Sequence, residues 1–237
     1  MQTLLLRLSA PMQSWGDESD FEYRRTRREP SKSGVIGMVA SAMGRSRDED
    51  IKDLCSLRFG VRVDREGDDI NRYDFQTTHA AKSKNGKYIK LKNGEYENEE
   101  KSTVLAYRYY LYDAAFLVGL EGDDDVIQRV KEALCAPMWP IFLGRRSCPP
   151  AGQVVLAIRN VPLEQALREE PLLDNAMPSN GMVRYLIESD AEEGTYFQRD
   201  NPASYAPEKR IFDLRKVNEF YASLPGPHIE HDPFSVL

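Results

Sequence analysis

The sequence contains few residues of the two types that most often bind metals. Its three cysteines, Cys55, Cys135 and Cys148, are an odd number, and no two of them form a CxxC pair. This spacing argues against a disulfide framework and against a thiolate zinc site. Histidine is just as scarce, with only His79 in the body of the chain. We therefore expect free thiols, no metal ion and no other cofactor.

Long apolar runs are also missing. Mean hydropathy is −0.56, and no stretch approaches the roughly 18 apolar residues of a membrane span. The apolar start at Leu4 to Leu6 is interrupted by Arg7 and is too short for a secretory signal. These features predict a cytoplasmic protein that does not enter a membrane. A length of 237 residues suffices for one domain with a real core, so we expect a single domain over 1–237.

The net charge of −6 conceals an uneven distribution. Residues 164–200 carry nine acids and three bases, and the rest of the chain is balanced. Within that remainder, residues 24–32 read RRTRREPSK and residues 82–92 read KSKNGKYIKLK. Such blocks can neutralise phosphates whatever the total charge is, because salt screens surface electrostatics beyond about 10 Å. A solvated basic face is the alternative interpretation of these blocks.

The hydrophobic pattern alternates between strands and helices. We predict strands over 2–8, 58–64, 114–120, 154–158, 182–188 and 210–217, and helices over 33–43, 48–57 and 123–134. Ser33 is the expected cap of the first helix. This order favours an α+β fold, the ferredoxin-like (RRM-like) arrangement with helices on one face of an antiparallel sheet. Additional strands follow toward the C-terminus.

The segment from Arg24 to Gly37 is a candidate phosphate site. Arg24, Arg25 and Arg27 lead directly into a predicted helix start at Ser33-Gly34. Free backbone N–H groups and the positive end of the helix dipole favour an anion there, and guanidinium groups add to the effect. Helix packing served by glycines explains the same pattern equally well.

The loop LGRRSCPP, residues 143–150, is a second candidate. Gly144 is followed by Arg145, Arg146 and Ser147, and two prolines stiffen the exit. Such a loop can present N–H groups and bidentate guanidinium groups to phosphates. The lysine pattern of a phosphate-binding loop is missing, which argues against a nucleotide triphosphatase.

The third candidate is a long two-stranded excursion between Tyr73 and Tyr112, with Asn-Gly turn signals at 85–86 and 93–94. It combines lysines with aromatic residues, the combination that holds single-stranded nucleic acid. The aromatic residues and the histidine are Tyr73, Phe75, His79, Tyr88, Tyr96, Tyr107, Tyr109 and Tyr110. Packing within the sheet is the alternative role for any one of these side chains.

Four segments, taken in order, resemble a known family: LLLRLSAPMQSWG, TRREPSKSGVIGMVASAMG, YRYYLYDAAFLVGL and PIFLGRRSCPPA. Together they are similar to the CasD family, the Cascade subunit of type I-E CRISPR systems, up to about residue 151. The resemblance implies a RAMP-superfamily protein with a ferredoxin-like core and a thumb hairpin, here at about 76–106. It also implies a role in capping the 5′ handle of the CRISPR RNA (crRNA).

The resemblance further implies partners and a binding site. The implied partners are the crRNA 5′ handle, the large subunit and the adjacent backbone subunit of Cascade, with target DNA reached indirectly through the complex. Combining the resemblance with the three candidate sites, we predict RNA-binding residues at Trp15, Arg24, Arg25, Arg27, Lys32, Ser33, Gly34, Thr78, His79, Lys82, Arg108, Gly144, Arg145, Arg146 and Ser147.

Two alternatives to a non-catalytic RNA-binding subunit stay open at this point. In related type I-C systems the corresponding subunit cleaves the repeat RNA without a metal, and His79, Lys82 and Tyr73 could supply the base, cation and acid of that reaction. The other alternative is a scaffold that binds only protein, in which the acidic region 164–200 docks a basic neighbour. We predict the non-catalytic RNA-binding role.

Overall fold

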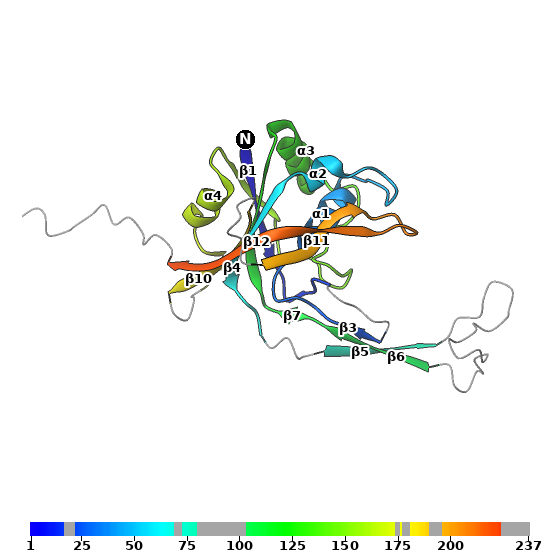
Figure 1. Cartoon of the computed structure of the whole chain (residues 1–237). Helices are drawn as coiled ribbons and strands as arrows, with labels where there is room; N and C mark the ends of the chain where they lie inside the picture. Colours follow the sequence, from blue (N-terminus) through cyan, green and yellow to red (C-terminus); the bar gives the residue numbers. More distant parts are fainter. Residues whose placement is uncertain are drawn as a thin grey trace, which may run out of the picture.

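The computed structural model describes residues 1–16, 22–68, 73–79, 103–173, 176, 181–189 and 196–223. Its main feature is a seven-stranded antiparallel sheet with strand order β11-β12-β10-β4-β8-β1-β9 (Figure 1). The strands are β1 (Gln2–Ser9), β4 (Arg58–Arg65), β8 (Ala115–Gly122), β9 (Val155–Arg159), β10 (Met182–Glu188), β11 (Tyr196–Ser204) and β12 (Ile211–Ser223).

The helices confirm the predicted α+β class. They are α1 (Lys32–Ala42), α2 (Lys52–Cys55), α3 (Asp124–Cys135) and α4 (Leu163–Glu169). The elements β1, α1, β4, β8, α3 and β9 follow one another as a βαββαβ unit, interrupted by α2 and by the excursion that precedes β8. The strands β10, β11 and β12 then extend the sheet beyond β4, as the predicted additional strands require.

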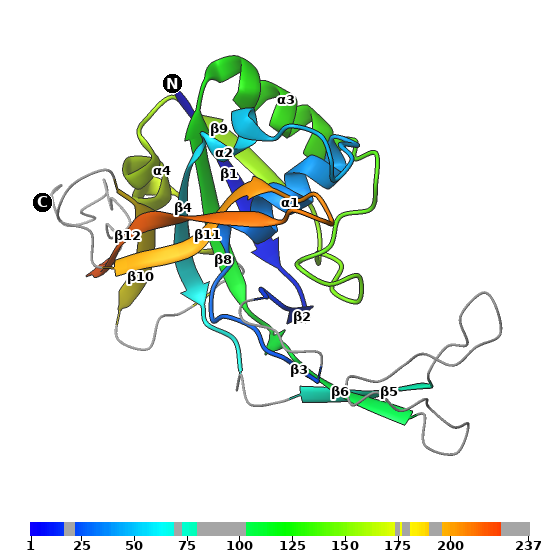
Figure 2. The ribbon, with the colours of Figure 1, turned by 45° about the vertical axis from the view of Figure 1, so that its right-hand side comes forward.

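Both faces of the sheet are covered, although the sequence predicts helices on one face only. Leu4 and Leu6 of β1 pack in the core cluster beneath α1 and α3, whereas Leu5 packs with Leu163 and Leu167 of α4 on the opposite face. Figure 2 shows α4 on the other side of the sheet from α1, α2 and α3. A central strand buried on two sides needs a continuous apolar run, which explains the leucine sequence of β1.

The helix boundaries differ from the predicted ones at two places. The cap of α1 is Ser31, whose Oγ accepts a hydrogen bond from the backbone N of Gly34 at 3.2 Å, so Ser33 lies inside the helix. The second helix is only one turn long, α2, where residues 48–57 were expected. The third predicted helix, 123–134, agrees closely with α3. Asp123 is its N-cap, and the Asp123 carboxylate accepts a hydrogen bond from the backbone N of Asp125.

Two smaller sheets branch from the body. The strands β2 (Met12–Gln13) and β7 (Leu111–Tyr112) form one of them. The other contains β3 (Tyr23–Arg24), β6 (Thr103–Tyr109) and β5 (Tyr73–His79), and it projects away from the main sheet (Figures 1 and 2). These strands form the base of the predicted thumb, whose residues 80–102, including Lys82, lie outside the described residues.

The projecting sheet has two chemically different faces, since strand residues alternate between faces. One face carries Tyr73 paired with Tyr109, and Phe75 paired with Tyr107. The ring of Tyr23 stacks on that of Tyr107 with centroids 5.0 Å apart. The opposite face carries cations, described with the site below. None of the described helices is long and apolar enough to cross a membrane.

An ion pair in the interior fixes α4 against the sheet. Arg62 and Asp64 of β4 are both buried and form two contacts, at 2.7 and 2.8 Å. Arg62 also donates to the backbone oxygens of Leu167, Glu170 and Pro171. Leu167 lies in the last turn of α4, and Glu170 and Pro171 follow its end, so Arg62 satisfies carbonyls at the C-terminus of that helix.

Candidate nucleic-acid interface

The loop of residues 143–148 is held in one conformation by the backbone. The N of Leu143 donates to the O of Cys148 at 2.7 Å, and the N of Cys148 donates to the O of Arg145 at 2.9 Å. The N of Ser14 donates to the O of Leu143 at 3.2 Å and docks the loop on the N-terminal segment. Gly144 has φ of 87°, and a Cβ there would lie 1.7 Å from the oxygen of Ser14. Only glycine therefore fits this position.

Arg145 leaves the loop and bridges to the projecting sheet. Its Nη2 donates to the backbone oxygen of Arg24 at 2.8 Å, and its guanidinium carbon lies 4.8 Å from the ring centroid of Tyr110. The other terminal nitrogen, Nη1, is buried and has no hydrogen-bond partner within the described part of the chain. Because this nitrogen belongs to a guanidinium at the surface loop, it can donate to an acceptor brought by a ligand.

The cations of the projecting sheet lie beside this loop. Arg24 of β3 pairs with Arg108 of β6, which in turn lies opposite Asp74 of β5. Because Arg145 donates to Arg24, this part of the sheet is next to the 143–148 loop. Arg146 is exposed in the loop itself. We call Arg24, Arg108, Arg145 and Arg146 the arginine cradle.

The Nε of Arg108 is a second buried donor without a partner among the described residues. Ser147 lies at the floor of the cradle, with its Oγ 3.5 Å from the hydroxyl of Tyr110 and 3.8 Å from the sulfur of Cys148. Burial raises the pKa of the Cys148 thiol, so this cysteine is a packing residue rather than a nucleophile.

A groove of 410 Å³ lies along α1, and Gly144, next to Arg145 of the cradle, is part of its lining. Small side chains of α1 form its floor, and an adjoining space of 190 Å³ continues it under residues 140–144. The cations Arg47 and Arg210 stand on its rim, and both are exposed. The ring-bearing and small residues that line it include Ser14, Trp15, Ser33, Gly34, Gly37, Ser41, Phe142, Gly144, Tyr205 and Phe212.

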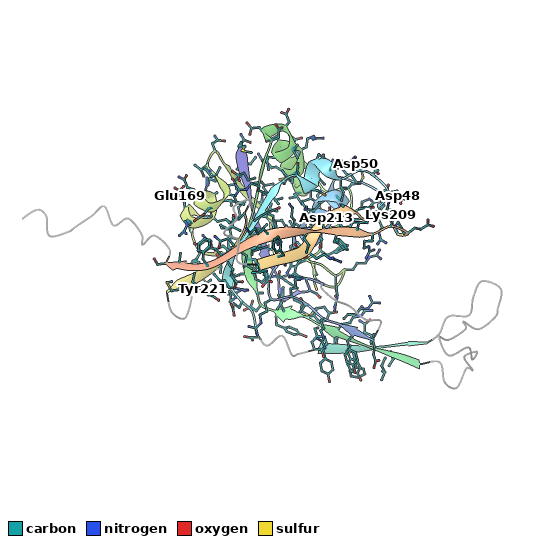
Figure 3. The ribbon with its side chains drawn as sticks, viewed as in Figure 1. Asp48, Asp50, Glu169, Lys209, Asp213 and Tyr221 are labelled. Carbon is teal, nitrogen blue, oxygen red and sulfur yellow. The ribbon has the colours of Figure 1, made fainter. Side chains whose placement is uncertain are left out.

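The far wall of this groove comes from the β11–β12 hairpin. The hydroxyl of Tyr205 donates to the backbone oxygen of Ser33 at 2.5 Å and closes the wall onto α1. Lys209, next to Arg210, lies at the turn of this hairpin, on the side of the molecule away from Glu169 of α4 (Figure 3). The groove thus combines residues from the two ends of the chain.

Protein groups already bind the N-terminus of α1, where the sequence offers a candidate phosphate site. The carboxylate of Asp200 in β11 accepts a hydrogen bond from the N of Lys32 at 2.8 Å, and Ser31 caps the N of Gly34. Asp200 is buried and also paired with Arg215 at 2.5 Å. A phosphate would have to displace this carboxylate, so Asp200 already supplies the anion that the helix end favours.

Lys32 and Trp15 are also placed differently from the prediction. Lys32 is buried, and its Nζ lies 2.9 Å from a carboxylate oxygen of Glu188, so its charge is matched inside the protein. Trp15 is 1% exposed and donates through Nε1 to Gln13 at 3.1 Å. A Cβ at Gly34 would lie 2.9 Å from the Trp15 ring. Helix packing is therefore the role of Gly34, and Trp15 is an interior residue at the edge of the groove.

The remaining predicted residues lie in the segment before α1 and on strand β5. Arg25 is exposed, and the backbone N of Arg27 donates to the O of Trp15 at 2.8 Å. Thr78 and His79 lie at the outer end of β5. Tyr73 is six residues before His79 on this strand, which separates their backbones by about 20 Å at ~3.3 Å per residue. Tyr73 and His79 are therefore too far apart to act on one phosphate group.

Sequence reasoning missed several residues of this site. Asp200 occupies the end of α1, and Tyr205 with Arg210 completes the groove. These three residues lie far along the chain from the residues they meet, so no local signal marks them. Tyr110 stands among the aromatic candidates of the sequence, but its role as the support of Arg145 is visible only in the structure. Among the described residues no cluster of three metal-ligating side chains occurs.

Comparisons with known proteins agree on one family. The family model described as CRISPR-associated protein (Cas_Cas5) matches residues 3–218. The chain is 34% identical over 158 residues to the CRISPR system Cascade subunit CasD of Escherichia coli (strain K12), a match that covers 62% of this chain and 66% of that protein.

Two solved structures have the same fold. A chain of a CRISPR RNA-guided surveillance complex superimposes with a TM-score of 0.78 at 32% identity, covering 94% of this chain and 91% of that one. A structure described as a Cas protein gives a TM-score of 0.69 at 37% identity, covering 94% and 95%. The chain therefore belongs to the Cas5 family of CRISPR-associated proteins.

Proposed function

We propose that this chain is the crRNA-binding subunit of a type I-E Cascade complex and that its arginine cradle holds the 5′ handle of the crRNA. The observation that carries this proposal is the position of Arg145, whose guanidinium is fixed by Arg24 and Tyr110 and keeps one buried donor without a partner among the described residues. The similarity to CasD and to a chain of a surveillance complex supports the same function.

The cradle has the chemistry that binding an RNA backbone requires. Guanidinium forks bind phosphate oxygens bidentately, and Arg108 and Arg145 each keep a buried nitrogen available for such a bond. Ser147 adds a hydroxyl next to them. These groups are rigidly placed, because the loop is closed by its own backbone hydrogen bonds, so little ordering is needed when RNA binds.

The groove beside α1 suits an unstacked nucleotide that leaves the cradle. It has 410 Å³ of space, aromatic rings at Phe142, Tyr205 and Phe212, and cations at Arg47 and Arg210. Sequence-specific RNA binding commonly uses unstacked bases held between aromatic or guanidinium planes. Gly37 lies next to Tyr205, and its lack of a side chain leaves space in the groove, since a Cβ there would lie 3.4 Å from the Tyr205 hydroxyl oxygen.

We propose a non-catalytic role, with the large subunit and the adjacent backbone subunit as protein partners, target DNA reached through the complex, and the cytoplasm as its location. The ribonuclease alternative needs Tyr73 and His79 at one phosphate, and the length of β5 keeps them about 20 Å apart. The hypothesis of a scaffold that binds only protein gives no role to the arginine cradle, in which Arg145 meets Arg24 and Arg24 pairs with Arg108.

The decisive experiment measures handle binding by the purified chain and by its Arg145→Glu/Arg146→Glu variant. Labelled crRNA is titrated in EDTA and followed by fluorescence anisotropy, while a denaturing gel records whether the RNA stays intact. We expect at least a tenfold loss of affinity in the variant and no cleavage by either protein, because two phosphate contacts become repulsive.

The matched control is Arg159→Glu, which reverses an exposed charge at the end of β9, where Arg159 pairs with Glu170 and not with a residue of the cradle. It should keep RNA affinity within twofold of the original chain. Equal affinity of the cradle variant and the original chain would refute the cradle assignment. Discrete cleavage that disappears in His79→Ala would instead assign the chain to the processing ribonucleases.

A further inference from the structure

A run of exposed and uncharged residues follows α3. All six residues of 135–140, with the sequence CAPMWP, are exposed, and Met138 and Trp139 are 70% and 59% exposed. The chain as a whole is 30% charged, yet no charge occurs between Glu132 and Arg145. Exposed apolar runs of this length mark interaction surfaces in folded proteins. We call residues 135–140 the apolar ridge.

The apolar ridge is held in place against α1. The N of Met138 donates to the backbone oxygen of Ala42 at 2.8 Å. Gly44 has φ of 76°, and a Cβ there would lie 3.0 Å from the Cγ of Met138. Pro137 and Pro140 each restrict the backbone. A surface that is already ordered loses little conformational entropy when a partner docks, so exposure here does not reflect a loose loop.

A groove of 570 Å³ lies beside the ridge, between the C-terminal ends of α1 and α3. Its lining is mostly apolar, with Arg129 and Glu132 as one cation and one anion. RNA would need a surplus of cations at its phosphates, which this balanced lining does not offer. An apolar side chain from a protein fits it, and Trp139 next to it is the residue type most enriched at the centres of protein interfaces.

We propose that the apolar ridge and this groove dock a second protein subunit of the same ribonucleoprotein. The ridge is continuous with the RNA site, since Pro140, Ile141 and Phe142 line the adjoining part of the α1 groove from its other side. A protein that covers Trp139 would therefore sit beside the bound RNA. This inference rests on the proposed function, because it takes the partner from the complex that the RNA assembles.

The partner's chemistry follows from the residues that meet it. Trp139 requires an apolar pocket with one acceptor for its indole N–H, and the groove requires a single apolar side chain. Charged groups of the partner belong at the rim, opposite Arg129 and Glu132. A second copy of this chain and an RNA segment are the competing occupants, and the experiment below separates them.

The test follows Trp139 directly, because the chain contains only two tryptophans and Trp15 is 1% exposed. The chain is labelled with 5-fluorotryptophan, and its two ¹⁹F signals are assigned with Trp139→Phe. We expect the Trp139 signal to shift when the RNA-bound assembly of the other subunits is added, and to stay in place with RNA alone. The Trp15 signal should respond to RNA, because Trp15 lines the α1 groove, and should not change further when the other subunits are added.

A second measurement uses variants of the full chain. Met138→Ala/Trp139→Ala should weaken incorporation into the assembly at least tenfold, whereas Phe197→Ala, at a residue that is 68% exposed on β11, should change it less than twofold. All variants should bind free crRNA within twofold of the original chain. That RNA measurement separates this inference from the proposed function, which depends on the arginine cradle.

Three results would overturn the proposal. Incorporation of the Met138→Ala/Trp139→Ala variant at the original affinity would show that the ridge docks nothing in the assembly. A Trp139 signal that shifts with RNA alone would identify RNA as the occupant. A signal that depends only on the concentration of this chain, together with a dimer by light scattering, would identify a second copy.

Discussion

Arg145 lies over the ring of Tyr110, with 4.8 Å between the guanidinium carbon and the ring centroid, while the same guanidinium donates to the backbone oxygen of Arg24. The 143–148 loop, strand β3 of the projecting sheet and Tyr110, which follows β6, meet at this one side chain. Its stacked face is covered by Tyr110, and its free edge keeps one buried donor. This arrangement makes Arg145 the least replaceable cation of the cradle.

Replacing Arg145 with lysine should weaken crRNA binding by about 5- to 30-fold although the charge is kept. A lysine loses the planar fork and the stacking on Tyr110, which together contribute about 1–2 kcal/mol. Arg146→Lys is the matched control, because Arg146 is exposed, and it should cost less than threefold. Anisotropy titrations of both variants check this; equal losses would mean that only charge matters.

Gly144→Ala should destabilise the folded chain by about 3 kcal/mol or more. The new Cβ would meet the oxygen of Ser14 at 1.7 Å, and φ of 87° adds strain. Gly181→Ala is the control for strain alone, since Gly181 has φ of 64° and no described atom within 4 Å of its Cβ. It should cost about 1 kcal/mol. Urea unfolding gives both values, and similar losses would contradict the close contact.

Arg62 and Asp64 should behave as a coupled pair. Arg62→Met leaves the buried carboxylate of Asp64 without its cation and should cost about 3–5 kcal/mol. The double variant Arg62→Met/Asp64→Leu should be less destabilised than the sum of the two single variants, by about 1–3 kcal/mol. A double-mutant cycle from urea unfolding measures this. Strict additivity would show that the capping of α4 outweighs the ion pair.

Cys135 should react with iodoacetamide well before the other two cysteines. Burial raises the pKa of Cys55 to about 11, and its sulfur donates to the O of Pro202 at 2.6 Å. At pH 8 only about 0.1% of such a thiol is ionised. Burial also raises the pKa of Cys148, whereas Cys135 is exposed. Peptide mass spectrometry over a time course gives the order, and early labelling of Cys55 would be inconsistent with this packing.

The chain should lose stability in alkali partly through Tyr196. Burial and the carboxylates of Glu219 and Glu29 raise its pKa to about 12 from the ordinary value of 10. Because the folded state favours the neutral phenol, the stabilisation is fully present below pH 10 and is lost as pH rises toward 12. Tyr196→Phe should make this loss shallower in urea unfolding at about pH 9 and 11. Tyr221→Phe, at an exposed tyrosine (Figure 3), should leave the slope unchanged.

Much of the fold follows from local patterns in the sequence. The leucine run of β1, the amphipathic α3 with its aspartate cap and the apolar alternation of β4 are short-range signals, and each lies in an element of the predicted type. The alternation of β4 does not predict its burial, because the polar Arg62 and Asp64 are buried as well. The loop at Gly144 is equally local, because a glycine before two arginines and two prolines constrains its own backbone. Helix α4 and strand β11 escaped prediction because they are short or carry polar residues and depend on the sheet they pack against.

The candidate site divides in the same way. The arginines of the cradle stand out in the sequence as charge blocks, but their partners do not, since Tyr110 and Arg24 meet Arg145 only after the loop docks. Lys32 reads as a phosphate contact in the sequence and is a buried partner of Glu188 in the structure. A charge pattern alone cannot show whether a lysine binds phosphate or pairs inside the protein, because Glu188 lies over 150 positions from Lys32 in the chain.

The sequence by itself determined the class of fold, the family and the positions of the two basic segments, because each depends on residues that are neighbours in the chain. The tertiary structure decided which cations remain available. It placed the Asp200 carboxylate on the α1 N-terminus and buried Trp15 and Lys32. Within the described part of the chain, it left one buried donor each of Arg108 and Arg145 without a partner. Burial and charge pairing are properties of surfaces brought together by folding, so only the folded chain assigns them.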